Sequence, residues 1–208
     1  MNFLITDDHA IVRRGLIGIL KDVYPKARFF EAGNGREALA MLSRQPMDIM
    51  LIDISMPGRN GLETVKQLRA QGVACPILVL SMHSENQYAL RALKAGASGF
   101  LNKEIATAEL VNAVQKVLGG KIYVTSSVAE KLAERLTKKS GNDPIENLSD
   151  REMEVLMLLA SGKSISEIAD ELSLSSTTVS TYRARILDKL QLANNAEITK
   201  YALENGIV

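Results

Sequence analysis

The stretch Asp-Ile-Met-Leu-Ile-Asp at residues 48–53 decides the fold class of this 208-residue chain. Its four central residues are apolar, and it lacks the polar alternation of a strand that has one face in water. Such a run is typical of a strand covered on both faces within a parallel sheet. Similar short runs occupy residues 3–6, 76–80 and 99–101, and a weaker β-like run occupies residues 28–32.

The segments between these runs have the period of helices. Apolar residues recur at helical spacing within residues 11–20, 35–43, 62–68, 88–95 and 105–118. Strands that alternate with helices in this way indicate βαβ units and a parallel sheet. We therefore expect a flavodoxin-like α/β domain, with a doubly wound five-stranded parallel sheet, over residues 1–120.

Polar side chains follow four of the expected strands. Asp7 and Asp8 follow the first, Asp53 ends the third, Ser81 follows the fourth and Lys103 comes after the fifth. Because ligands of doubly wound sheets bind outside the carboxyl ends of the strands, these residues are expected at one edge.

Three carboxylates at one edge repel one another unless a cation joins them. A hard divalent ion with oxygen ligands, Mg²⁺ (or Mn²⁺), suits such a cluster. Asp53 could then attack a phosphoryl group as a nucleophile and form an aspartyl phosphate. The cation and Lys103 would neutralise charge on the phosphoryl oxygens, and the Ser81 hydroxyl could donate to one of them.

This set of residues resembles the receiver domain of two-component response regulators, over about residues 1–120. The resemblance is carried by the Asp7-Asp8 pair, Asp53-Ile54-Ser55-Met56-Pro57, Gly61, Ser81, Phe100 and Lys103. It implies that Asp53 is the phosphoacceptor and that a sensor histidine kinase is the partner. It also implies that Asp8, Asp53 and the backbone carbonyl of Ser55 bind the metal, with Asp7 acting through water. Ser81 and Phe100 occupy the positions of the hydroxyl and aromatic switch residues.

The chain departs from the receiver pattern at two positions. Glu104 follows Lys103, where receiver domains often have a proline with a cis bond. A cis bond to a residue other than proline costs about 3 kcal/mol, which favours a trans bond here. The switch aromatic is Phe100 rather than tyrosine, so it has no hydroxyl to bond.

The chain after residue 120 divides into a linker and a helical domain. Residues 125–137 have the pattern of a connecting helix, and residues 138–144 are polar, with a glycine and a proline, as in a linker. We assign residues 121–146 to this linker. Residues 147–208 then form an all-α domain of four helices.

The signals for helix starts in this domain are strong. Ser149-Asp150-Arg151-Glu152 and Ser164-Ile165-Ser166-Glu167 are capping boxes, Ser175-Ser176 opens a third helix and Asn194-Asn195 a fourth. The turn at residues 172–176 separates the second and third helices as in a helix-turn-helix, whose second helix enters the DNA major groove.

The charge of this domain is unusual for a DNA-binding unit. Residues 144–208 contain six basic and ten acidic residues, a net charge of −4, whereas DNA-binding surfaces are normally basic. Three of the six basic residues, however, lie on the expected recognition helix. At 100° per residue, Val179, Ile186 and Leu190 face the core of the domain. Ser180, Thr181, Ala184, Arg185, Asp188 and Lys189 then face outward.

The domain resembles the LuxR-type helix-turn-helix of NarL/FixJ response regulators, over residues 147–208. Residues 148–156, Glu167-Ile168-Ala169, Thr178-Val179 and Lys189-Leu190 carry the resemblance. It implies that Ser180, Thr181 and Ala184 face DNA bases. It places Arg183, Arg185 and Lys189 on phosphates, and Thr177 and Thr178 near the DNA backbone. Ser180-Thr181-Tyr182 replaces the lysine and histidine frequent in the family and is more similar to the GacA/BvgA-type subgroup.

The two resemblances predict a phosphorylation-controlled transcription regulator. It would dimerise on activation and bind double-stranded DNA at two promoter half-sites, without turning over a substrate. A single cysteine excludes a disulfide framework, and two histidines exclude most histidine metal clusters. We expect a cytoplasmic protein without membrane contact, because the chain has neither a signal peptide nor an apolar run of about 18 residues.

Two alternatives remain open at this stage. A phosphatase or mutase could use the same aspartyl-phosphate chemistry, but haloacid-dehalogenase enzymes have a second aspartate two residues after the nucleophile, where this chain has Ser55. A constitutive DNA-binding or interaction protein with a vestigial receiver is the other. The intact Asp7, Asp8, Asp53 and Lys103 set argues against it, whereas the charge of −4 keeps weak or partner-assisted DNA binding open.

Overall fold

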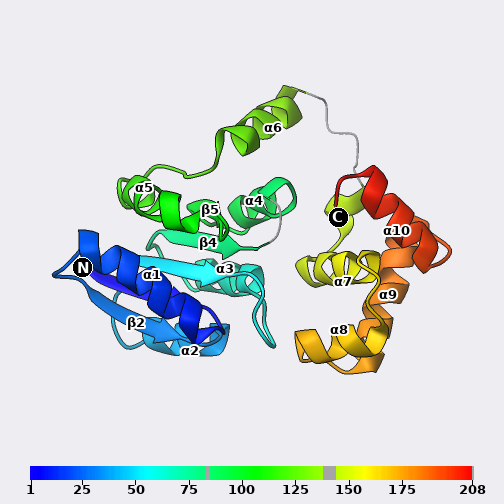
Figure 1. The fold of residues 1–208 in the computed structure, drawn as a ribbon, viewed down its shortest axis with the longest axis horizontal. Helices are drawn as coiled ribbons and strands as arrows, with labels where there is room; N and C mark the ends of the chain where they lie inside the picture. Colours follow the sequence, from blue (N-terminus) through cyan, green and yellow to red (C-terminus); the bar gives the residue numbers. More distant parts are fainter. Residues whose placement is uncertain (83–84, 138–143, 208) are drawn as a thin grey trace. The chain divides into compact units, whose positions relative to one another are not determined.

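The computed structural model of the chain describes residues 1–82, 85–137 and 144–207. The chain forms two compact units, residues 1–134 and residues 135–208 (Figure 1). The expected linker at residues 138–144 falls largely on residues 138–143, which lie outside the described part.

The first unit is built on a parallel sheet of five strands in the order β2-β1-β3-β4-β5. The strands are β1 (Asn2–Thr6), β2 (Arg28–Ala32), β3 (Ile49–Asp53), β4 (Ile77–Ser81) and β5 (Gly99–Asn102). Every residue of β3 and β4 is buried, as their continuous apolar runs require. The expected flavodoxin-like topology is confirmed, and the strand order reverses between β1 and β3, where such sheets bind ligands.

Five helices connect and cover these strands (Figure 1). They are α1 (Ala10–Val23), α2 (Gly35–Leu42), α3 (Gly61–Ala70), α4 (Glu85–Lys94) and α5 (Ala106–Leu118). Leu16 and Leu20 of α1 share a core with Leu110 and Val114 of α5 on one face of the sheet. The other three helices lie on the opposite face. Helix α4 begins before the expected residue 88, because its first turn is polar and so carries no apolar periodicity.

The chain returns to the sheet after α5. Tyr123 pairs in parallel with Gly99 at the outer edge of β5. The backbone N–H of Phe100 donates to the Tyr123 carbonyl at 3.0 Å, and the Tyr123 N–H donates to the Ser98 carbonyl at 3.0 Å. A Cβ atom on Gly99 would lie 2.7 Å from the Tyr123 oxygen, so this close approach requires glycine. Helix α6 (Ser126–Thr137) follows.

The second unit is helical. It contains the 3₁₀ turn η1 (Pro144–Asn147), α7 (Asp150–Ala160), α8 (Ile165–Leu172), α9 (Ser176–Leu190) and α10 (Asn195–Glu204). Both expected capping boxes are present at α7 and α8. Ser173 ends α8 in the left-handed region, at φ 52°, and turns the chain toward α9. The expected four-helix architecture with a helix-turn-helix is confirmed. Within the described ranges, no helix has the length and apolar character needed to cross a membrane.

Candidate functional site

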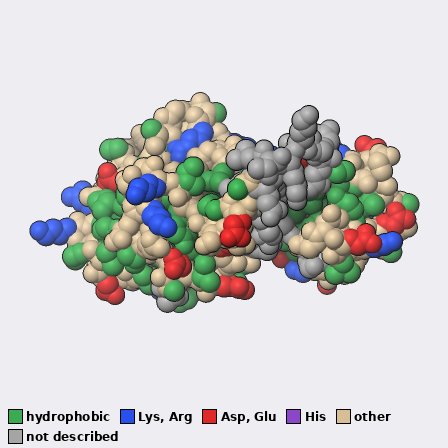
Figure 2. Space-filling model, turned by 90° about the horizontal axis from the view of Figure 1, so that it is seen from above, with side chains coloured by type: hydrophobic (Ala, Val, Ile, Leu, Met, Phe, Trp, Pro, Cys, Tyr) green, Lys and Arg blue, Asp and Glu red, His purple; other side chains and the backbone are tan. Residues whose placement is uncertain are grey.

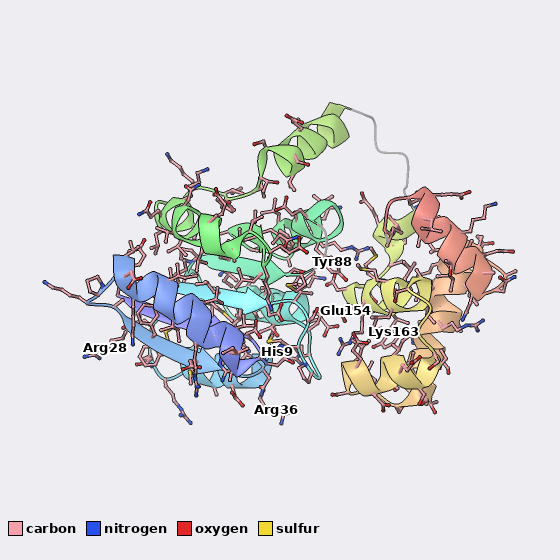
Figure 3. The ribbon with its side chains drawn as sticks, in the orientation of Figure 1. His9, Arg28, Arg36, Tyr88, Glu154 and Lys163 are labelled. Carbon is pink, nitrogen blue, oxygen red and sulfur yellow. The ribbon has the colours of Figure 1, made fainter. Side chains whose placement is uncertain are left out.

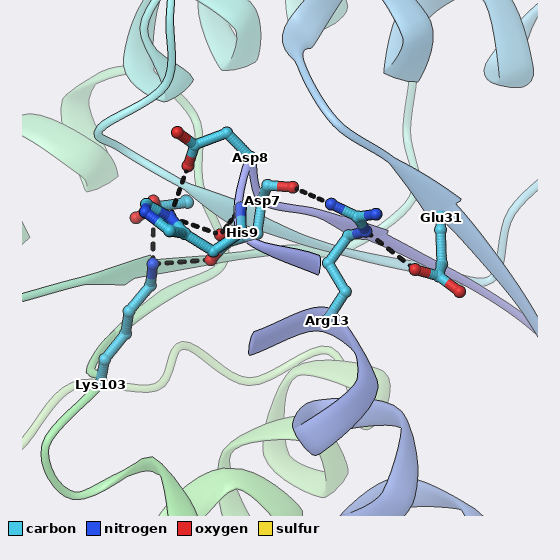
Figure 4. A network of polar contacts seen from close by, with 7 residues as sticks. Asp7, Asp8, His9, Arg13, Glu31 and Lys103 are labelled. Atoms are coloured by element: carbon cyan, nitrogen blue, oxygen red, sulfur yellow. Dashed lines mark hydrogen bonds and ion pairs between the residues drawn. The ribbon is translucent and has the colours of Figure 1, made fainter. Parts of the chain in front are cut away.

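The carboxyl edge of the sheet brings Asp7, Asp53 and Lys103 together. Figure 4 shows Lys103 beside Asp7. The Lys103 ammonium lies 2.6 Å from Asp7 Oδ2 and 2.8 Å from Asp53 Oδ2. Both carboxylates are almost fully buried, and the Lys103 side chain is 11% exposed. The sequence-based expectation that strands β1, β3 and β5 deliver these groups to one edge therefore agrees with the geometry.

The buried acid and base of this site have shifted pKa values. Burial raises the pKa of Asp53 to about 6, although the Lys103 charge and hydrogen bond pull it down, and Asp7 and Asp8 add repulsion. Burial lowers the pKa of Lys103, but the charge of Asp53 and the hydrogen bonds to both carboxylates outweigh burial, so the net shift is upward. Lys103 is thus a fixed positive charge, whereas Asp53 titrates within reach of neutral pH.

Asp8 and His9 form the more exposed side of the site. His9 Nδ1 lies 2.8 Å from Asp8 Oδ1 and 3.4 Å from Asp7 Oδ1 (Figure 4). Asp8 Oδ1 is buried and has no hydrogen-bond donor of suitable geometry in the described part of the chain, in spite of the nearby imidazole. Asp7, Asp8 and His9 each offer a ligand atom, and these atoms lie within 4.8 Å of one another. Two of the three are carboxylate oxygens, the ligands that a hard divalent cation prefers. The residues present therefore fit the expected Mg²⁺.

The remaining predicted residues of this edge lie in β4, in β5 and in the loop after β3. Ser81 is buried at the end of β4, and its carbonyl accepts the backbone N–H of Lys103 at 2.8 Å. Phe100 is buried in β5. Ser55 is exposed in the loop after β3. The described residues contain no cis peptide bond, so the bond between Lys103 and Glu104 is trans.

Helix α9 has the two faces that its sequence predicts. Val179, Ile186 and Leu190 are buried, while Thr177, Ser180, Thr181, Ala184 and Arg185 are exposed and Thr178 is partly buried. Two of its cations are already engaged. Arg183 Nε donates to Asn195 Oδ1 at 2.6 Å. Lys189 Nζ donates to Glu152 Oε2 at 2.7 Å and to the Asn147 carbonyl at 3.0 Å, contacts that compete with the expected phosphate contact of Lys189.

Comparison with known protein families agrees with both units. A family model described as the response regulator receiver domain matches residues 3–115, and one for bacterial regulatory proteins of the luxR family matches residues 146–202. The response regulator UvrY of Escherichia coli K12 is 33% identical over 208 residues, 100% of this chain and 95% of that protein. This chain is a response regulator of the NarL/FixJ group.

Two further response regulators are similar to this chain along almost its whole length. GacA of Pseudomonas aeruginosa is 31% identical over 206 residues, 99% of this chain and 96% of that protein. The structure of RcsB from Salmonella enterica serovar Typhimurium, bound to promoter rprA with phosphomimetic BeF₃⁻, has a TM-score of 0.63 and 26% identity. It covers 97% of this chain and 98% of that one. The expected similarity to GacA is confirmed, and the family is one of DNA-binding regulators rather than phosphatases. The domain limits at residues 120 and 147 stay predictions.

Two contacts at the receiver site were not predicted from the sequence. Arg13, on α1, donates to the Asp7 backbone carbonyl at 2.7 Å and forms an ion pair with Glu31 at 2.8 Å (Figure 4). No local pattern signals this contact, since only the packing of α1 on the sheet creates it. His9 directly follows the acidic pair, and that adjacency was the available signal for its place in the site (Figure 3).

Asn60 and Gly61 hold the loop after Asp53 in the receiver. A Cβ atom on Gly61 would lie 2.0 Å from the Asp53 carbonyl oxygen, so α3 starts directly against the backbone of the phosphoacceptor candidate. The buried Asn60 caps α3 by accepting the Glu63 N–H at 2.9 Å. Gly61 carried part of the family resemblance, and this close approach is its physical reason.

Proposed function

We propose that Asp53 accepts a phosphoryl group from a sensor histidine kinase and that this modification controls promoter binding by the helical unit. The observation that carries the proposal is the buried Asp53 carboxylate, 2.8 Å from the Lys103 ammonium. An ionised carboxylate beside a fixed cation is suited to attack an incoming phosphoryl group.

The transfer step conserves atoms and electrons. An Asp53 carboxylate oxygen forms a bond to phosphorus while the bond from phosphorus to the donor imidazole nitrogen breaks, and that nitrogen keeps the electron pair. Lys103 balances charge on the phosphoryl oxygens, and the Ser81 hydroxyl donates to one of them. The products are an aspartyl phosphate and a free histidine. The regulator takes part in its own modification but turns over no separate substrate.

Asp8, Asp53 and the Ser55 carbonyl would hold Mg²⁺ (or Mn²⁺), with Asp7 acting through water. The bound cation would supply charge neutralisation for the phosphoryl group. The chain's own contribution is to orient the three acids, through the backbone contact of Arg13 with Asp7 and the close packing of Gly61. Rearrangement of Ser81 and Phe100 after phosphorylation would then bias the surface of β4, α4 and β5.

The output would be DNA binding by a dimer. Ser180, Thr181 and Ala184 would face bases, Arg183 and Arg185 would bind phosphates, and Thr177 and Thr178 would lie near the backbone. RcsB structures are described with DNA and as dimers bound to DNA, which supports this mode for a relative of 28% identity.

Leu203 on α10 is 62% exposed and is a candidate dimer contact. A regulator that binds promoters acts in the cytoplasm.

The test is light scattering after size exclusion, combined with a DNA band shift on the same samples. Wild type and Asp53→Ala are compared with and without acetyl phosphate and Mg²⁺. We expect a donor-dependent shift from monomer to dimer with tighter DNA binding in wild type, and neither change in Asp53→Ala. Mass spectrometry counts the phosphoryl adduct. A phosphorylated wild type that neither dimerises nor changes its DNA affinity would overturn the proposal.

A further inference from the structure

An exposed stripe on α9, from Thr177 to Ala184, has a composition that restricts what it can recognise. Thr177, Ser180, Thr181 and Ala184 stand at the spacing i, i+3, i+4, i+7, and all four are exposed. Their side chains offer methyl groups and hydroxyls only. None is the arginine or lysine that pairs with guanine, or the asparagine or glutamine that pairs with adenine.

The hydroxyl of Thr181 is partly used within the helix. Thr181 Oγ1 donates to the Thr177 backbone carbonyl at 2.9 Å. A threonine hydroxyl has a single proton, so what Thr181 still presents outward is its methyl group and oxygen lone pairs. Ala184, one turn along the same stripe, presents a methyl group alone.

Two of the three neighbouring cations on α9 already have partners in the described residues. Arg183 is held by Asn195 of α10, and Lys189 is held by Glu152 of α7 and by the carbonyl of Asn147. Arg185 is exposed and shows no ion pair within the described residues. Arg185 lies directly after Ala184, and the proposed function gives it a phosphate contact. A guanine contact of Arg185 instead is the alternative that the test below distinguishes.

We propose that this regulator recognises thymine methyl groups in the major groove, with Thr181 and Ala184 as the specificity-determining side chains. The inference rests on the proposed DNA-binding function. Thymine is the one base that displays a methyl group in the major groove, and small apolar groups are its usual partners. The Ser180 hydroxyl can donate to the thymine O4 atom beside that methyl group.

The test begins with selection of binding sites from a random duplex library, using the full-length protein with acetyl phosphate and Mg²⁺. Each thymine of a selected site is then replaced singly by deoxyuridine, which removes only the methyl group. We expect an affinity loss of about fourfold at one or two thymines in each half-site, the effect of one buried methyl group.

Variants assign these losses to side chains. In Thr181→Ser the helix hydrogen bond can persist but the methyl group is gone, so the deoxyuridine effect should vanish at one thymine. Ala184→Gly should abolish it at another, with circular dichroism melting as the check on folding. Thr199→Ser is the matched control, because Thr199 Oγ1 also donates to a carbonyl four residues back, that of Asn195 at 3.2 Å, on α10.

Three results would overturn the inference, each in a recognisable way. Selected sites that tolerate deoxyuridine everywhere, or losses that persist in Thr181→Ser and Ala184→Gly, would exclude methyl recognition. Sensitivity to 7-deazaguanine that disappears in Arg185→Ala would assign the specificity to guanine and Arg185. Failure to select any DNA would instead overturn the DNA-binding function itself.

Discussion

Asp53 shows at the scale of one residue how a reactive group costs stability. Its pKa is about 6 in the folded protein and 3.8 for an unperturbed aspartate, so the folded chain holds this proton more tightly than the unfolded chain. The stability due to the protonated form is complete below the unfolded value and is lost as the pH rises through about 6. The ionised, cation-free site is thus less stable at neutral pH than in mild acid.

We predict that Asp53→Asn, which cannot ionise, is more stable than wild type at pH 7.5 in EDTA. The shift already includes the attraction of Lys103 and corresponds to about 3 kcal/mol, which is the upper limit of the expected gain. Urea unfolding at pH 7.5 and pH 4.5 measures it, with the exposed Asp22→Asn as control. A gain that is equal at both pH values would contradict the assignment to Asp53 ionisation.

The start of α3 packs directly against the backbone of β3, and only glycine fits at this contact. Gly61→Ala would drive a Cβ atom into the Asp53 carbonyl, and backbone atoms cannot move aside as a side-chain end can. We expect a loss of about 2 kcal/mol or more in the free energy of unfolding, together with slower phosphorylation. Gly18→Ala is the contrast: nothing lies within 4 Å of the new Cβ atom on α1, and a gain of about 0.5–1 kcal/mol is expected.

The contact between Lys189 and Glu152 ties α9 to α7. Burial alone would raise the pKa of Glu152, but the hydrogen bonds from Lys189 and Ser149 bring it below its usual value. We predict that Lys189→Met destabilises the helical unit by about 1 kcal/mol, since a charged hydrogen bond is lost. Thermal unfolding measures this, and Lys200→Met, in a longer and exposed pair with Glu204, should have little effect. An unchanged melting temperature in Lys189→Met would leave phosphate contact as its role.

Local patterns predicted the strands, the capping boxes and the position of the acids, because each depends on residues close in the chain or on the shared carboxyl edge of parallel strands. They could not predict the contact of Arg13 with Asp7 or of Lys189 with Glu152, which join helices to distant segments. The pairing of Tyr123 with Gly99 of β5 could not be predicted for the same reason, because it joins two residues that are distant in the chain and meet only in the folded sheet.

The whole molecule divides its charge unevenly. Residues 144–208 carry a net charge of −4, so the other 143 residues carry +5 of the total of +1. Figure 2 shows basic and acidic side chains interspersed over the visible face of the larger unit. In this helical unit of negative net charge, Lys189 of α9 is paired with Glu152, which leaves Arg183 and Arg185 as the α9 cations for phosphates.

We therefore predict a shallow salt dependence of DNA binding. Two phosphate contacts in each protomer, by Arg183 and Arg185, give a dimer a slope of log affinity against log salt of about −4. Band shifts at several salt concentrations measure it, and Arg185→Met should make the slope shallower by about 2 in a dimer. A wild-type slope near −10 would show that many more cations reach the DNA.

The pairing of Tyr123 with Gly99 also determines where this protein can be cut. A strand at the margin of a sheet exposes unpaired amides and carbonyls that recruit other chains, and Tyr123 occupies those of β5. A fragment that ends at residue 120 would uncover them, and we expect it to aggregate. A fragment that ends at residue 134 keeps the cap and should stay monomeric in light scattering. The segment after α5 therefore protects the edge of β5 from pairing with other chains, and it also connects the two units.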